Sequence, residues 1–342
     1  MAYGLNYNTT SADYSIKNIP DGEFVKKIAD IADGIYYTDF PATNKDDYSG
    51  TEDYSAAYAM AEIQFGDNLT LIPGVRYEHN KTEYKGVRGN SAALLWSDGY
   101  LFSDTTIANS NSFLLPMVHA KFKPTDWFDL RLAYTKTLAR PDFRNIIPSW
   151  DRQLTNVDWN NPFLRTSLST NYDVYASFYQ NKLGLFTIGG FSKDIEDLIY
   201  NAGRSTIIDT DQSAEYGLPP STAGQTISRT INNPFPVKLY GFEVEWQTRF
   251  WYLDNFLNGF VFNINYTHTI SEVKYPRTIL DRELLTEPPW VNITNIDTFY
   301  VDRLIAQPNN ILNASIGYDY KGLSTRVSMT YQDDIFSATN FW

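Results

Sequence analysis

The sequence predicts an all-β chain whose antiparallel strands run up and down beside one another, as in a transmembrane β-barrel with short periplasmic turns and long extracellular loops. Three observations predict this fold. Segments of roughly 10 to 14 residues alternate apolar and polar side chains, which is the pattern of strands with two different faces. The connections between these segments are alternately short and long. Aromatic residues gather beside the short connections.

The alternating segments follow one another in pairs along the chain. In the clearest of them, Val327 and Met329 belong to an apolar face, whereas Arg326 and Ser328 belong to a polar one. Side chains of a strand point alternately to its two faces, so this pattern indicates a strand between two different environments. We expect strands at about 54–65, 69–84, 112–123, 127–138, 169–180, 183–194, 238–250, 258–271, 309–320 and 323–332.

The connections indicate a membrane barrel more strongly than the strands do. Turn-forming residues make short connections at 66–68, 124–126, 181–182 and 321–322, with a looser one at 251–257. The connections between them are long, at about 85–111, 139–168, 195–237 and 272–308. Transmembrane barrels have short turns on the periplasmic side and long loops outside. We therefore expect consecutive strands to pair antiparallel, with all the short turns on one rim.

Alternation in a barrel places apolar side chains toward lipid and polar ones toward a water-filled lumen. The residues expected to face lipid are Leu130, Leu132, Val244, Trp246, Phe262, Ile264, Val327 and Met329. The charged residues expected to face the lumen are Arg76, Glu78, Arg131, Glu243, Glu245 and Arg326.

Two kinds of residue test the barrel interpretation. Trp127, the 250–252 segment and Tyr318 lie beside short turns, where an aromatic girdle is expected at the membrane interface; the alternative is that they are core aromatics of a soluble sandwich. Pro73 and Pro116 fall inside expected strands, where a proline removes a ladder hydrogen bond. A β-bulge at each proline would reconcile it with the strand scheme.

Composition excludes several classes of protein. The chain has 342 residues, and 28 basic against 40 acidic side chains give a net charge of −12, which disfavours nucleic acid as a partner. It has no cysteine, so disulfides, thiolate metal sites and cysteine nucleophiles are ruled out. Aromatic residues make up 16% of the chain, far from the composition of disordered chains. The longest apolar run, 56–61, is too short for a membrane-spanning helix.

Several segments, in order along residues 50–335, resemble TonB-dependent outer-membrane receptors of the Bacteroidetes type. They are LTLIPGVRYE at 69–78, LRLAYTKTLARPDF at 130–143, NPFL at 161–164 with STNYD at 169–173, GLFTIGGFSKDI at 184–195, YGFEVEW at 240–246 and LNGFVFNINYTH at 257–268. The resemblance implies a barrel of about twenty-two strands, filled by a plug that contacts TonB. Only about ten to twelve strands are recognised here, and neither a plug nor a signal peptide. We expect an irregular outer-loop segment at 1–50 and a single barrel portion at 51–342, truncated at both ends.

The resemblance implies uptake of a scarce nutrient, such as a siderophore, cobalamin, a glycan or a peptide, through the outer membrane of a Gram-negative bacterium. The implied partners are the TonB complex, reached through a plug that this chain lacks, the nutrient, outer-membrane lipid and a surface lipoprotein. No cofactor is implied. Two alternatives stay open: a passive porin-like or adhesive barrel, and a soluble β-sandwich that binds or hydrolyses glycans.

The 139–168 connection carries the candidate ligand-binding residues, because arginine forks suit carboxylate or phosphate and tryptophan faces suit sugar rings or cations. These candidates are Arg140, Arg144, Trp150, Asp151, Arg152 and Trp159. The alternative for Arg140 is a structural corner in which it pairs with a carboxylate. Apolar residues at 94–96 and 100–102 are expected to pack between loops. No catalytic or metal-binding motif is present, and the acidic residues at 209–211 lack the remainder of a calcium loop.

Overall fold

The computed structural model describes residues 4–8, 15–20, 23, 26–27, 47–90, 103–207, 209–287 and 291–336. The chain divides into two units, Met1–Asn44 and Lys45–Trp342. In the first unit, β1 (Gly4–Asn8) pairs antiparallel with β2 (Ser15–Pro20). The sequence analysis expects this segment to be irregular. The hairpin was not expected because neither of its strands shows a sustained alternation.

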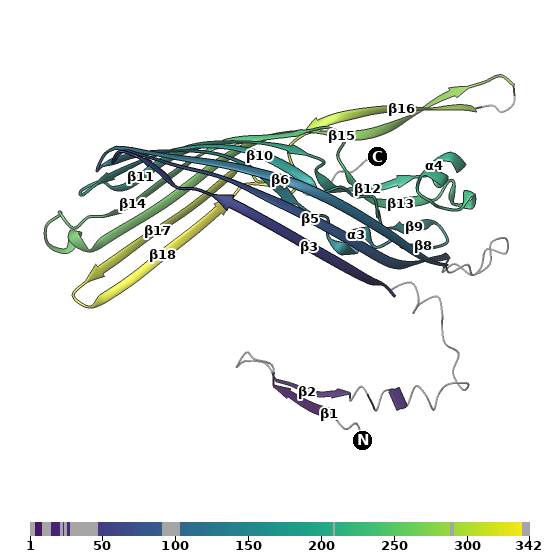
Figure 1. Ribbon diagram of the computed structural model, residues 1–342, viewed down its shortest axis with the longest axis horizontal. Coiled ribbons are helices and arrows are strands. Elements are labelled where there is room, and N and C mark those ends of the chain that lie inside the picture. Colours follow the sequence, from purple (N-terminus) through teal and green to yellow (C-terminus); the bar gives the residue numbers. More distant parts are fainter. Residues whose placement is uncertain are drawn as a thin grey trace. The chain divides into compact units, whose positions relative to one another are not determined.

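The second unit is built on one curved sheet of long strands (Figure 1). The strands are, in chain order, β3 (Ser49–Met60), β4 (Ile63–Phe65), β5 (Leu69–Asn90), β6 (Ser103–Thr125), β7 (Phe128–Ala139), β10 (Ser167–Gln180), β11 (Gly184–Glu196), β14 (Val237–Arg249), β15 (Phe260–Leu284), β17 (Asn310–Tyr320) and β18 (Leu323–Gln332). Each expected strand is present, with β3 and β4 together forming the first. Successive strands are antiparallel neighbours, which confirms the predicted fold class.

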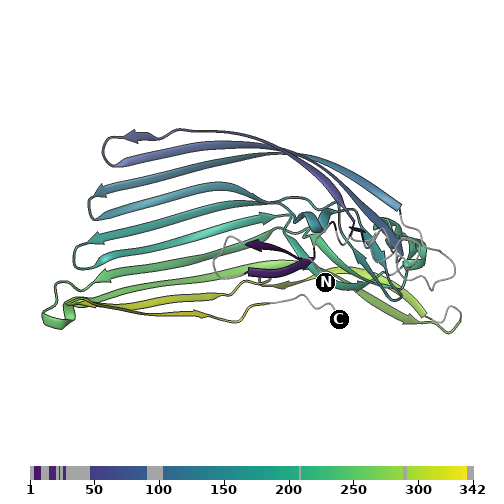
Figure 2. The same cartoon turned by 90° about the horizontal axis from the view of Figure 1, so that it is seen from below.

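The short connections lie together at one end of the sheet, and the long ones lie at the other (Figure 2). The backbone of the tight turns explains their residue types. Gly66, Gly184 and Gly322 have φ values of 60°, 80° and 86°, which a side chain would strain. The looser connection contains the 3-10 helix η2 (Asn255–Gly259). The predicted alternation of short turns and long loops is therefore confirmed.

Several connections at the second end contain regular structure that the sequence analysis did not predict. β5 and β6 extend as a long hairpin, and so do β15 and β16 (Val291–Asp302). Two further connections contain α3 (Phe143–Ile146), β8 (Trp150–Arg152), β9 (Asn156–Trp159), β12 (Ile199–Thr206), α4 (Thr210–Glu215), η1 (Pro220–Thr222) and β13 (Thr226–Asn232). Two pairings there are parallel, β5 with β8 and β9 with β13.

The strand register separates the side chains into two faces. On one face, Leu132 lies opposite Val174, and Val244 lies opposite both Ile188 and Tyr266. Following the register from strand to strand places all eight residues expected to face lipid on this face. The six charged residues expected to face the lumen lie on the opposite face. Which face lines a lumen stays a prediction.

The apolar face of the sheet is strongly exposed in the described part of the chain. Leu114 is 62% exposed and Val327 66%, while most of the buried apolar side chains gather in two clusters outside the tight-turn half of the sheet. A soluble sandwich would bury this face against a second sheet. The exposed apolar face therefore suits contact with lipid and argues against the sandwich alternative.

The two prolines fit the sheet without the β-bulges that would have reconciled them with it. The register between β5 and β6 runs without a shift past both Pro73 and Pro116. At Pro73 the neighbouring strand is instead interrupted between β3 and β4, and the amide of Ala61 donates to the Pro73 carbonyl at 3.0 Å. Pro116 comes immediately before Met117, the first residue that β6 pairs with β7. Each missing N–H thus falls where a ladder is interrupted or ends.

Candidate functional site

Two outer connections fold together into one compact structure, and we name them for their contents. The tryptophan loop is 139–168 and the helix loop is 195–237. Their strands form a small sheet in the order β12, β13, β9, β8, which continues onto the far end of β5. The two loops share an apolar core. Its buried residues are Val157, Ile207, Leu218 and Ile227, and the partly buried Trp150, Trp159 and Tyr216 pack against them.

The two candidate tryptophans of the tryptophan loop belong to this core. Trp150 and Trp159 are cross-strand partners on β8 and β9. The Trp159 indole donates from Nε1 to the Tyr216 carbonyl oxygen at 3.0 Å, and the two rings lie 5.3 Å apart between centroids. Both tryptophans therefore pack the two loops together, and whether they also contact a ligand stays a prediction.

Arg152 joins the two loops through its guanidinium group. The residue is only 4% exposed. Its Nη1 donates to Ser221 Oγ at 2.8 Å, its Nη2 donates to the Ser221 carbonyl at 2.8 Å, and its Nε donates to Gln225 Oε1 at 3.2 Å. Asp151, its neighbour, is 8% exposed. The structure thus gives Arg152 protein partners, and direct contact with a ligand is untested.

Arg140 and Arg144 have different surroundings at the start of the tryptophan loop. Arg140 donates to Glu78 and lies over the Tyr54 ring at 5.1 Å, which is the structural corner considered as its alternative. Arg144 is exposed, and its backbone amide donates to the capping Asp142 side chain at 2.9 Å. Arg144 is the candidate arginine whose side chain is most accessible to a ligand.

Electrostatics in the outer part follow from burial and pairing. Burial raises the pKa of the Tyr216 phenol, although the Arg229 guanidinium beside it acts in the opposite direction. A hydrogen bond to Asp197 raises the pKa of Arg165, whose Nε donates to that carboxylate at 3.1 Å. Both groups therefore keep their ordinary protonation state at neutral pH.

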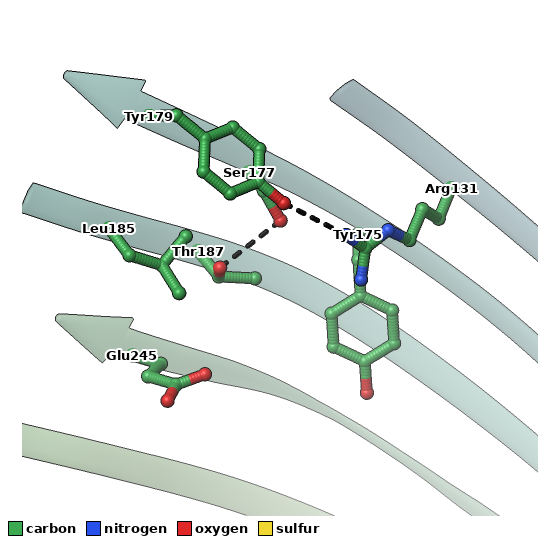
Figure 3. A pocket seen from close by; sticks show the side chains of 7 residues that line it. All are labelled: Arg131, Tyr175, Ser177, Tyr179, Leu185, Thr187 and Glu245. Atoms are coloured by element: carbon green, nitrogen blue, oxygen red, sulfur yellow. Dashed lines mark hydrogen bonds between the residues drawn. The ribbon is translucent and has the colours of Figure 1, made fainter. Parts of the chain in front are cut away.

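The polar face of the long sheet carries a second candidate site. A cavity of about 340 Å³ is lined by seven residues of β7, β10, β11 and β14 (Figure 3): Arg131, Tyr175, Ser177, Tyr179, Leu185, Thr187 and Glu245. A neighbouring cavity of about 430 Å³ shares Arg131 and Tyr175 with it. Arg131 donates to Tyr179 Oη at 2.9 Å, and both contact the buried Asp129. Two of the predicted lumen residues thus line a polar groove.

Tyr175 crosses this groove because the strand beside it has no side chain. Tyr175 is paired with Gly189, which is paired in turn with Glu243 on β14. A Cβ on Gly189 would meet the Tyr175 ring, with its Cγ at 2.8 Å. The ring thus lies over the glycine, and its hydroxyl donates to Glu243 Oε2 at 3.0 Å.

We expect Gly189→Ala to destabilise the sheet by about 1–3 kcal/mol, since the added methyl must displace the Tyr175 ring and break its bond to Glu243. Urea unfolding followed by tryptophan fluorescence measures the change. Gly190→Ala is the matched control, because a Cβ there would meet its nearest atom only at 3.7 Å. Equal losses from the two variants would contradict this packing.

Some predictions concern absences or lie outside the described residues. In the described ranges no group of three or more histidine or acidic side chains could hold a metal ion. No helix among the same residues is long and apolar enough to cross a membrane. The apolar segments 94–96 and 100–102 lie outside the described residues, so their expected packing is untested.

Sequence reasoning missed most of the partners in the outer core. Tyr216, Ser221 and Gln225 lie in the helix loop, where no strand alternation marks them. Their partners lie 57 to 73 residues earlier in the chain, so a local pattern carries no signal for these contacts. A hint was available in Gly217, which ends α4 with a φ of 65° and turns the chain.

Comparison with known proteins identifies a family that the sequence matches and solved structures that are similar in fold. A family model described as the TonB-dependent receptor-like β-barrel matches residues 2–341. No curated protein matches the sequence significantly. The hemophore receptor HasR of Serratia marcescens, solved with its hemophore HasA and heme, is similar in fold at 14% identity and a TM-score of 0.55, over 83% of this chain and 44% of that one.

Two further solved structures share the fold. The siderophore receptor PiuA of Acinetobacter baumannii has 12% identity and a TM-score of 0.51, over 85% of this chain and 34% of that one. The copper transporter OprC has 10% identity and a TM-score of 0.51, over 79% and 33%. The chain therefore spans less than half the length of each of these proteins. At such identities the likeness shows the fold alone.

Proposed function

Since the chain belongs to the TonB-dependent receptor β-barrel family, we propose that it forms part of the wall and of the outer recognition surface of an outer-membrane nutrient importer. The wall is the long sheet, with its apolar face toward lipid and its charged face toward the lumen. The recognition surface is the outer sheet of the tryptophan and helix loops. Energy for import comes from TonB in this proposal, through a plug that occupies the lumen.

The observation that carries the proposal is the separation of charge between the two faces of one sheet. Arg76 lies on β5 and Glu243 lies on β14, several strands away in the sheet, yet the register places both on the same face. A lumenal charge is solvated, whereas an arginine facing lipid near the midplane costs about 2–4 kcal/mol. The pattern therefore supports a membrane wall around a polar interior.

The class of nutrient is proposed from the relatives. HasR is named as a hemophore receptor, PiuA as a siderophore receptor and OprC as a copper transporter. A scarce metal complex is therefore the first class to test, with cobalamin, glycans and peptides next. The cell outer membrane of a Gram-negative bacterium is the proposed location, and a surface lipoprotein is a further proposed partner. The Bacteroidetes type of the receptor stays a prediction.

Growth under nutrient limitation tests the proposal. The complete receptor gene is expressed in a Gram-negative host that lacks its own receptors, and the medium supplies iron chelates, heme, copper or cobalamin singly at limiting concentration. We expect one supplement to restore growth, and only when the host has a working TonB. Growth that is independent of TonB would instead favour the passive porin-like barrel. Absence of growth on every supplement and on glycans or peptides would contradict uptake.

A further inference from the structure

Arg88 occupies an unusual position at the outer end of the sheet. It lies near the end of β5, on the same face as Arg76 and Glu78. Beside it, β8 pairs in parallel with β5 so that Arg88 is the partner of Trp150. Arg88 thus stands where the wall of the sheet meets the outer sheet, and its side chain is partly buried.

Two buried hydrogen-bond donors without a partner lie on these two paired residues. Within the part of the chain that the structure describes, the guanidinium Nε of Arg88 and the indole Nε1 of Trp150 are both buried and have no hydrogen-bond partner. Unpaired buried donors are rare, because each loses its water without gaining a partner. Two of them on paired residues indicate a place where an acceptor binds.

The charge of Arg88 is also uncompensated. Burial lowers the pKa of its guanidinium, and no carboxylate among the described residues acts in the opposite direction. Other arginines of the outer part differ in this respect. Arg165 pairs with Asp197, and Arg303 pairs with Asp334 at 2.6 Å. A partly desolvated cation without a counter-ion is a favourable partner for an anion.

The turn after α4 lies against the guanidinium group. Arg88 Nη1 lies 3.7 Å from the point that a Cβ on Gly217 would occupy, which is an ordinary contact distance. Gly217 carries no side chain, and its φ of 65° keeps the turn tight. The preceding Tyr216 is bonded to Arg229, whose guanidinium carbon lies 5.3 Å from the ring centroid. The turn that contacts Arg88 therefore carries an aromatic–cation pair at Tyr216 and Arg229, with Glu215 also near the Tyr216 phenol.

We propose that Arg88 and Trp150 form a subsite for an anionic group, a carboxylate or a phosphate, of the nutrient that the receptor recognises. The guanidinium would provide charge and a fork of donors, and the indole N–H would add one hydrogen bond from the neighbouring strand. The inference rests on the proposed function for the identity of the ligand. The two paired donors indicate an anionic ligand even though the net charge of the whole chain is −12.

Nuclear magnetic resonance of the indole N–H groups tests the subsite. The receptor is purified in detergent micelles with ¹⁵N-labelled tryptophan, and the Trp150 resonance is identified as the one that Trp150→Phe removes. Inorganic phosphate and citrate are titrated separately, with sodium chloride at the same ionic strength as the reference. We expect a saturable shift of the Trp150 resonance with at least one of the two anions and none with chloride. The anion that gives the shift identifies the group as phosphate or carboxylate.

Variants connect the shift with the arginine. Arg88→Gln should weaken anion binding at least about tenfold, because it removes the charge and its charge-assisted hydrogen bonds and leaves a shorter, uncharged polar side chain. Arg165→Gln removes the same charge from another outer position and should leave the titration unchanged. Unchanged indole resonances of the tryptophans other than Trp150 before titration show that the Arg88 variant is folded.

The outcomes separate this proposal from the proposed function. Absence of a saturable shift with both anions would overturn the subsite and assign water to the two donors. A shift that persists in Arg88→Gln would overturn it as well. If the Trp150 resonance shifts with an anion but the receptor supports no TonB-dependent growth, nutrient import is overturned and the anion site remains.

Discussion

Val244→Arg is expected to keep most of the protein molecules from folding into a membrane, because it places a charge in the middle of the apolar face. Val244 lies near the centre of β14, between Ile188 and Tyr266 on the neighbouring strands. An arginine facing lipid at this depth costs about 2–4 kcal/mol, which lowers the ratio of folded to unfolded protein by about 30-fold to 1,000-fold. Folding into lipid vesicles in a urea titration, with the heat-dependent gel mobility of the folded sheet as a second readout, measures the loss.

The neighbouring residue provides the control for this variant. Glu245→Arg introduces the same side chain one position further along the strand, on the polar face, where water solvates the charge. We expect it to fold nearly as well as the natural chain. The same contrast is expected between Val327→Arg and Arg326→Val on β18. Comparable losses from Val244→Arg and Glu245→Arg would show that the apolar face does not meet lipid.

The long strands were predictable from the sequence because their two environments differ along the whole length of the sheet. A strand between lipid and water must alternate with period 2, and a shift by one residue would exchange the faces. Tight turns add a local signal, as at Gly184 and Gly322, where the backbone requires a positive φ. Strand ends were less predictable, since the hairpin of β5 and β6 continues beyond the alternating part into residues of mixed character.

The outer sheet could not be predicted in the same way, because its contacts join distant parts of the chain. Sequence types alone suggested ligand contact for Trp150 and Arg152, since exposed aromatic and arginine side chains often bind ligands. In the fold, Trp150 packs against the apolar core of the outer sheet and Arg152 donates to Ser221, and their contact with a ligand stays a prediction. In the sequence, Arg88 is a single basic residue near the end of a long strand, and no pattern marks it as a candidate. It became a candidate only when the register placed it beside Trp150.

Replacing Trp150, Arg152 and Trp159 together by Ala in the complete receptor is expected to abolish growth on the imported nutrient while leaving surface expression intact. Truncating an aromatic side chain in a core costs about 3–5 kcal/mol, and each hydrogen bond of a charged group contributes about 1.5–3 kcal/mol. The outer core is small, so these losses should open it. The long strands, which carry none of the three residues, should keep their fold. Surface labelling and growth on the limiting nutrient measure the two expectations.

A protease added to whole cells distinguishes the two reasons for which the triple variant would fail. If the three side chains act by holding the tryptophan and helix loops together, the variant should be cut in the helix loop, whereas the natural receptor should resist. Arg144→Ala is the control, because Arg144 is exposed in the same loop and its loss should leave the outer core closed. A triple variant that resists the protease yet does not grow would assign the three side chains to direct ligand contact. Normal growth of the triple variant would place recognition elsewhere, with the plug as the next region to test.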